Sequence, residues 1–310
     1  GQGKFSGYMF GDYYYNISHN DSTLKGLNGF WFRRIYFTYD YEISENFNTR
    51  FRLEMNTPGD YKSKDRLIPY VKDAYLSYER LTHSLILGVS PTPTWEYIEG
   101  FWGYRCVEKT PLDLYKIGDS RDFGIAFKGS FGKNGIFKYH IMGGNGEGLK
   151  PELNKGKKVM GSLLFNPLKS ISLELYSDYG YADKKKEYLF QGFLGWKIEK
   201  SSIGVQYSHY IKKGKEKLEI NVFSLFSVLK ISEKLSIFGR YDRVTEPLPW
   251  GKGISYTPFN DNSSFHLFIF GFDFHPIKNV SFIPNIFYVH YTEESLEKDI
   301  QSRFTFFYSF

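Results

Sequence analysis

Apolar and polar side chains alternate along Phe47-Asn48-Thr49-Arg50-Phe51-Arg52-Leu53-Glu54-Met55. Successive side chains of a β-strand point to opposite faces, so this alternation predicts a strand with one apolar and one polar face. The pattern recurs in 171–176 and in 303–310. The chain is therefore predicted to consist of two-faced strands. No segment predicts a helix, although residues 94–116 have room for one helical turn.

Aromatic side chains make up 20% of the 310 residues, with 30 Phe, 26 Tyr and 5 Trp. A soluble core fills well with Leu, Ile and Val, and disordered chains are poor in rings, so the composition fits neither class. No window holds the ~18 consecutive apolar residues that a membrane-spanning helix needs. The single Cys106 excludes an intrachain disulfide, and the net charge of +6 includes no basic arm for nucleic acid. No signal-like segment opens the sequence, so we expect any export signal to have been removed or left out.

Turn-forming residues divide the sequence into about sixteen predicted strands. Most are twice as long as the average soluble strand of about 5–6 residues, and a tilted strand that crosses a bilayer needs about 9–11. The predicted segments are 3–15, 27–43, 47–57, 67–80, 84–91, 120–131, 136–146, 157–166, 170–181, 187–198, 202–212, 217–230, 234–246, 262–275, 279–292 and 299–310.

The gaps between these segments alternate in length. Gaps after even-numbered segments are tight, such as 44–46 and 81–83, whereas most gaps after odd-numbered segments are longer, such as 16–26, 58–66 and 92–119. Short turns at one end and long loops at the other are typical of an outer-membrane β-barrel. We therefore expect a single all-β domain, residues 1–310. It is predicted to form a transmembrane antiparallel barrel of about sixteen strands with both termini periplasmic.

The apolar strand faces allow one alternative, a soluble sandwich in which they pack against a second sheet. In a barrel these faces meet lipid and the polar faces line water. The strand length, the arginine-rich polar faces and the rings near strand ends, such as Tyr39 and Tyr41, favour the barrel. Tyr in particular prefers a membrane interface, because one end of its side chain is apolar and the other forms hydrogen bonds.

The C-terminal segment resembles a known signal. The chain ends in Phe304-Thr305-Phe306-Phe307-Tyr308-Ser309-Phe310. The alternate rings Phe306, Tyr308 and Phe310 resemble the C-terminal signal of bacterial outer-membrane barrels, which the barrel assembly machinery reads. An aromatic girdle at the membrane interface would have the same pattern.

A second resemblance spans most of the chain and is diffuse over 150–230. It is carried by Arg33-Arg34, Phe51-Arg52-Leu53-Glu54, Val71-Lys72-Asp73-Ala74-Tyr75-Leu76, Leu87-Gly88-Val89-Ser90-Pro91, Ser120-Arg121-Asp122-Phe123-Gly124, Asn145-Gly146-Glu147-Gly148 and Gly239-Arg240-Tyr241-Asp242. Their order and spacing resemble the phosphate-selective porin O and P family. The resemblance implies a sixteen-stranded channel that is commonly trimeric, and it does not establish phosphate selectivity.

The gap 92–119 is by far the longest. The resemblance implies that it folds into the barrel as a constriction loop, which would narrow a lumen that is otherwise too wide to discriminate. An external cap that packs its own rings is the alternative. The candidate constriction residues are Trp95, Glu96, Glu99, Trp102, Arg105, Glu108, Lys109 and Lys116.

Strand alternation also predicts which charges face the lumen. Arg34, Arg50 and Arg52 lie on neighbouring predicted strands and would form a basic patch that attracts anions. The alternative is that most inward charges pair with each other and only stiffen the wall. The candidate pore-lining residues are Arg34, Arg50, Arg52, Glu54, Asp73, Asp122, Arg240, Asp242 and Arg303.

Together these patterns predict a porin, a passive diffusion channel for small hydrophilic solutes or ions, with a weak anion preference. Its expected partners are outer-membrane lipid, the barrel assembly machinery and its own copies in a homotrimer. No cofactor, metal site or enzymatic activity is expected, because the seven His lack metal-ligand spacing and no Ser-His-Asp arrangement stands out. A plugged or scaffold barrel that holds a protein partner is the alternative function.

Overall fold

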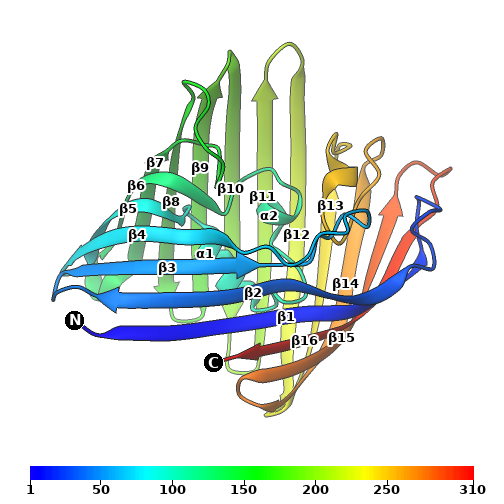
Figure 1. The fold of residues 1–310 in the computed structure, drawn as a ribbon, viewed down its shortest axis with the longest axis horizontal. Helices are drawn as coiled ribbons and strands as arrows, with labels where there is room; N and C mark the ends of the chain where they lie inside the picture. Colours follow the sequence, from blue (N-terminus) through cyan, green and yellow to red (C-terminus); the bar gives the residue numbers. More distant parts are fainter.

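The computed structural model describes residues 1–310 as a closed antiparallel barrel of sixteen strands (Figure 1). Each strand pairs with its sequence neighbours, and β16 closes the sheet on β1, where Ser309 lies opposite Tyr8. Closure pairs the backbone groups that an open edge would leave unsatisfied in lipid. The predicted fold class is confirmed.

All sixteen predicted segments correspond to strands, and their ends differ from the predicted ends by at most three residues. The strands are β1 (Gly3–Ser18), β2 (Asn28–Glu42), β3 (Phe47–Met55), β4 (Tyr70–Arg80), β5 (His83–Pro91), β6 (Arg121–Phe131), β7 (Phe137–Gly144), β8 (Lys157–Leu168), β9 (Ile171–Ala182), β10 (Lys185–Lys197), β11 (Ser201–Lys213), β12 (Lys217–Ser232), β13 (Leu235–Val244), β14 (Phe265–Ile277), β15 (Val280–Tyr291) and β16 (Asp299–Ser309).

The two ends of the barrel differ. Tight connections, such as 81–82 and 198–200, lie at the end that also holds both chain termini, and we call this the short-turn end. The longer connections, including 56–69, 145–156 and 245–264, lie at the opposite, long-loop end. Of two single-turn 3-10 segments, Lys133–Gly135 lies in the short turn between β6 and β7, and Gly251–Gly253 lies in the long connection 245–264.

Outward side chains are mostly apolar and inward ones mostly polar. In β9, Leu175 is 68% exposed, whereas its neighbour Glu174 is 3% exposed. In β16, Phe304 is exposed between the buried Arg303 and Thr305. Alternation along each strand thus gives the barrel an apolar outer surface, which is the surface that a membrane solvates.

The connection between β5 and β6, residues 92–120, folds into the barrel, and we call it the inner loop. It contains α1 (Trp95–Trp102) and α2 (Pro111–Leu114), where the sequence predicted at most one helical turn. Gly103 ends α1 in the left-handed conformation, and Pro111 occupies the first position of α2, as is common at helix ends. Neither helix is long and apolar enough to cross a membrane.

The inner loop fills part of the lumen with an apolar core. The ring of Trp102 packs on Phe226 and Phe238, with centroids 5.0 and 5.9 Å apart, and Tyr115 packs on Phe265 at 5.8 Å. These partners belong to β12, β13 and β14, so the loop packs against the side of the barrel that these three strands form. The space between the loop and the opposite wall, β1 to β6, is polar.

Candidate functional site

Glu54 of β3 is buried between two cations of the neighbouring strands. Its Oε1 lies 3.5 Å from Nε of Arg34 in β2, and its Oε2 lies 3.1 Å from Nζ of Lys72 in β4. A buried charge is tolerated only when it is paired, and Glu54 supplies that pairing for both cations. One negative charge therefore faces two positive charges.

Asp73 of β4 repeats this arrangement one strand further. Its Oδ2 lies 3.0 Å from Nη1 of Arg52 in β3, and its Oδ1 lies 2.5 Å from Nε of Arg121, the first residue of β6. The guanidiniums of Arg34 and Arg52 both lie over the buried ring of Tyr36, 4.6 and 4.8 Å from its centroid. Cation–π contact of this kind fixes the two side chains against the wall.

The inner loop presents the opposite balance of charge. Arg105 lies 3.3 Å from Glu99 and 3.6 Å from Asp113, so one cation faces two carboxylates. Glu96 is paired at 2.9 Å with Lys128 of β6.

A cavity of about 320 Å³ separates the wall from the loop. Four cations of strands β2, β3, β4 and β6 line the wall side and outnumber Glu54 and Asp73 by two charges. On the loop side, Glu99 and Asp113 outnumber Arg105 by one charge. The wall is thus net positive and the loop net negative, which sets an electric field across the cavity. The wall cations are Arg34, Arg52, Lys72 and Arg121.

Two β-bulges place adjacent residues inside the barrel. Phe10 pairs with Arg34 and Gly11 with Phe32, which leaves Arg33 without a partner in β1, and both arginines are buried. In the β3–β4 ladder, Lys72 is left over in the same way beside Asp73. A bulge inserts one residue and re-aims the side chains that follow it.

Arg33 and Lys72 were missed by sequence reasoning, because strict alternation gives one inward residue of each adjacent pair. The signal that would have pointed to both bulges is the pair of adjacent charges, Arg33-Arg34 and Lys72-Asp73, because uninterrupted alternation would turn one charge of each pair toward lipid.

Three arginines from different strands of the barrel bind the tip of the inner loop, residues 106–109. Arg33 binds Asp12 at 2.5 Å and donates to the carbonyls of Val107, at 2.8 Å, and Cys106. Arg240 of β13 donates to the Lys109 carbonyl at 2.5 Å, and Arg303 of β16 lies 3.2 Å from Glu108. We call Arg33, Arg240 and Arg303 the anchoring arginines.

The anchoring arginines and burial together set the protonation states of Glu108 and Cys106 at this tip. Burial raises the pKa of Glu108, but the Arg303 and Arg33 guanidiniums outweigh burial and lower that pKa to about 2. Burial raises the pKa of the Cys106 thiol to about 12. Glu108 is therefore a carboxylate, and Cys106 an uncharged thiol, at neutral pH. No group of three or more His, Cys, Asp or Glu residues is arranged to hold a metal ion.

The structure divides the candidate residues between several places. Those at the cavity between wall and loop are Arg34, Arg52, Trp95, Glu96, Glu99 and Arg105, with Glu54 and Asp73 behind them. Those buried where the loop meets the wall are Trp102, Glu108, Arg240, Asp242 and Arg303, and Lys109 follows Glu108 there with its side chain half-buried.

The remaining candidates lie elsewhere. Arg50 is paired with Asp40 at 2.6 Å and lines another cavity, of about 620 Å³, nearer the short-turn end. Asp122 accepts a hydrogen bond at 2.8 Å from the amide of Gly146, so it holds a long-loop turn. Lys116 donates at 2.8 Å to the carbonyl of Gly253. At the C-terminus, Tyr308 and Phe310 are exposed and Phe306 is half-buried.

Comparison with solved structures shows that the chain has the fold of bacterial outer-membrane porins. It resembles the anion-selective porin from Comamonas acidovorans (12% identity, 100% of this chain and 99% of that one, TM-score 0.74). It also resembles OmpF of Salmonella typhi in complex with daunomycin (12%, 99% and 97%, 0.71) and the outer membrane channel DcaP of Acinetobacter baumannii (12%, 100% and 97%, 0.70). No family model matches the sequence, and no curated protein is significantly similar to it. At these identities the likeness is one of fold.

Proposed function

We propose that the protein is a porin, an outer-membrane channel through which small hydrophilic solutes diffuse passively, with a preference for anions. The observation that carries this proposal is the excess of wall cations over their carboxylate partners at the cavity beside the inner loop. Guanidinium groups stay charged at any relevant pH and bind carboxylate or phosphate oxygens in a fork, so small oxyanions are the favoured solutes. Low-dielectric walls strengthen this field.

We also propose an orientation and an assembly. Short turns of outer-membrane barrels face the periplasm, so the short-turn end and both termini belong on that side. Phe306, Tyr308 and Phe310 would then present the C-terminal signal to the assembly machinery. One similar structure is described as the trimer form of OmpT from Vibrio cholerae, which supports a homotrimer for this chain too. Chemical cross-linking of the detergent-extracted protein tests the trimer, and a monomer band alone contradicts it.

Conductance in a planar bilayer tests the channel. We expect steps of uniform size, and a reversal potential in a KCl gradient that indicates more permeant chloride than potassium. A protein that inserts but stays silent is not a diffusion channel. Steps with a cation-selective reversal potential would leave the channel in place and remove the anion preference.

A plugged or scaffold barrel is the second candidate, and one observation favours it. A cluster of 34 buried apolar residues, contributed by the inner loop, the strands and the connection 245–264, occupies the interior. An interior packed in this way blocks the part of the lumen that it fills. If the purified barrel is silent, a pull-down from periplasmic extract would be the next measurement for a scaffold. The barrel should be immobilised so that its short-turn end and both termini stay accessible.

A further inference from the structure

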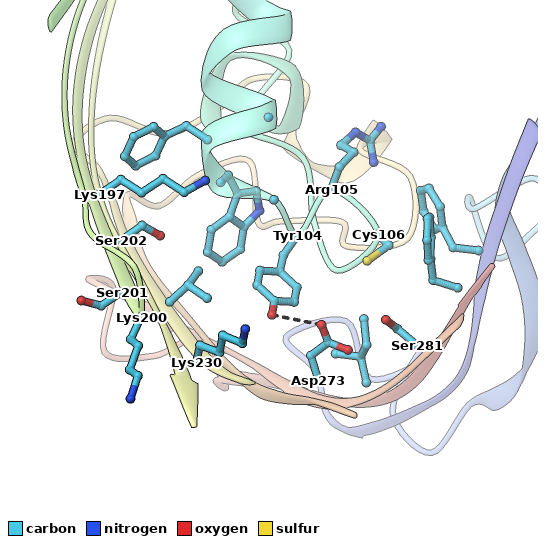
Figure 2. Close-up of a pocket in the computed structure, with 18 of the residues that line it drawn as sticks. Tyr104, Arg105, Cys106, Lys197, Lys200, Ser201, Ser202, Lys230, Asp273 and Ser281 are labelled. Atoms are coloured by element: carbon cyan, nitrogen blue, oxygen red, sulfur yellow. Dashed lines mark hydrogen bonds between the residues drawn. The ribbon is translucent and has the colours of Figure 1, made fainter. Parts of the chain in front are cut away.

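A second cavity, of about 410 Å³, opens at the short-turn end below the tip of the inner loop (Figure 2). One wall is the loop segment 100–106. The other comprises the β10–β11 turn and inward residues of β12, β14, β15, β16 and β1. It is only partly separate from the cavity between wall and loop, since Tyr8, Gly100, Gly103 and Arg105 border both cavities.

The body of this cavity is apolar and aromatic. Phe101, Tyr104, Val228 and Ile283 line it. The Tyr104 ring is held by stacking on Phe238, with centroids 4.2 Å apart, so it presents a fixed face. A ring or branched alkyl group fits such a lining, because burial of apolar area against aromatic side chains is favourable.

The negative end of the cavity is Asp273. Its Oδ2 accepts a hydrogen bond from the Tyr104 hydroxyl at 3.1 Å and lies 3.5 Å from Nδ1 of His275, whereas its Oδ1 is buried without a partner (Figure 2). A buried carboxylate oxygen without a donor is costly, and an ammonium group is the donor that suits it best. This end of the cavity therefore suits a cationic group.

The positive end comes from two lysines. Lys197 and Lys230 extend into the cavity, whereas Lys200 turns away from it (Figure 2). Lys230 is also 2.9 Å from the exposed Glu233, a surface pair of little net strength that a ligand carboxylate can replace.

The sheet register sets the separation of the two ends. Lys230 pairs with Ser236, and Ser236 pairs with Asp273, so the lysine and the aspartate are two strands apart. Strands are spaced by about 4.8 Å, which places the two backbones about 10 Å apart, and a long lysine side chain shortens the gap between the charges. One small molecule that bears both charges can therefore reach both ends.

We propose that this cavity binds a zwitterion with an aromatic side chain, that is, an aromatic α-amino acid or a short peptide that carries one. Its ammonium group meets the Asp273 carboxylate, its carboxylate meets Lys230, and its ring packs on Phe101 and Tyr104. A simple aromatic acid would leave Asp273 without a counter-charge, and a simple amine would leave the lysines without one. The site goes beyond the proposed diffusion function, since binding does not depend on conductance.

Three probes with the same ring separate the contributions of the two charges. L-phenylalanine carries both, 3-phenylpropionate lacks the amine and 2-phenylethylamine lacks the carboxylate. Binding is measured at pH 8 on the detergent-solubilised full chain by ligand-observed NMR or calorimetry. We expect phenylalanine to bind about tenfold more tightly than either analogue, a difference of about 1.4 kcal/mol, because each analogue lacks one of the two charge pairs. Equal binding of all three, preference for an analogue, or no binding would overturn the proposal.

Matched variants place the site. Asp273→Asn is expected to abolish the preference for phenylalanine over 3-phenylpropionate, and Lys230→Met to abolish its preference over 2-phenylethylamine. Lys200→Met removes a lysine that faces away and should leave all three affinities unchanged. If Lys200→Met weakens binding as much as Lys230→Met, the probes bind elsewhere. A conducting channel without these preferences defeats this inference alone, whereas a silent barrel that retains them defeats only the proposed function.

Discussion

Arg33 and Arg34 are consecutive residues of β2, yet both point into the barrel and serve different carboxylates. Arg33 binds Asp12 at 2.5 Å and holds the inner loop, whereas Arg34 lies 3.5 Å from Glu54 and borders the cavity between wall and loop. The bulge at this point directs one arginine to the inner loop and the next to the cavity beside it, whereas a regular strand would need residues two positions apart for this.

Deletion of Arg33 tests the role of the bulge. Because Arg33 has no partner in β1, its removal restores regular pairing without shifting the rest of β2. We expect the barrel to fold and the inner loop to loosen, which single-channel recordings would show as larger open-channel current noise. Deletion of Ile35, which pairs with Met9 and Met55, shifts the register and should prevent folding. Equal tolerance of both deletions would show that the bulge is not a discrete insertion.

The wall cations are expected to set ion selectivity. The double variant Arg34→Gln, Arg52→Gln should move the reversal potential toward cations in dilute salt, because Glu54 and Asp73 then face one cation each. The shift should shrink in 1 M salt, where the Debye length falls to about 3 Å. Arg50→Gln is the control, since Arg50 pairs with Asp40 in another cavity. If the control shifts reversal as much as the double variant, selectivity is not set at the wall cations.

The Glu108–Arg303 pair should make stability depend on acid. The folded-state pKa of Glu108, about 2, lies below its ordinary value of 4.5, so the pair contributes stability that is complete above pH 4.5 and lost as pH falls toward 2. We expect the apparent melting temperature, followed by near-ultraviolet circular dichroism, to fall over this window. Glu108→Gln should lower it at pH 6 and flatten its pH dependence. The exposed Glu233→Gln should behave like the parent, and an unchanged acid profile in Glu108→Gln would contradict the assignment.

Leu175 tests which surface meets lipid. It lies near the middle of β9 and is strongly exposed, so an arginine there would enter the hydrocarbon region at a cost of about 2–4 kcal/mol. We expect Leu175→Arg to lower the yield of folded barrel in lipid vesicles. Leu153→Arg, in an exposed long-loop connection, should fold like the parent. Equal yields for both variants would mean that the outer face does not meet lipid.

Local patterns were sufficient for the barrel itself. Phe51, Arg52 and Leu53 already indicate a two-faced strand, because successive side chains of an uninterrupted strand point to opposite faces. The alternation of tight and long gaps then fixes antiparallel order, since each connection must return the chain to the adjacent strand. The turn-forming residues give the sixteen strands, and the prediction of a membrane barrel requires that β16 closes on β1.

The site depended on contacts between residues far apart in sequence. Nothing local shows that Arg121 shares Asp73 with Arg52, or that Arg303 reaches Glu108, because these pairs form only when the inner loop packs against the wall. The bulge at Arg33 is likewise decided by its pairing with β1. Sequence alternation determined which face each strand turns to water, whereas tertiary packing decided which charges remain uncompensated, because compensation depends on distances across the lumen that no single strand encodes.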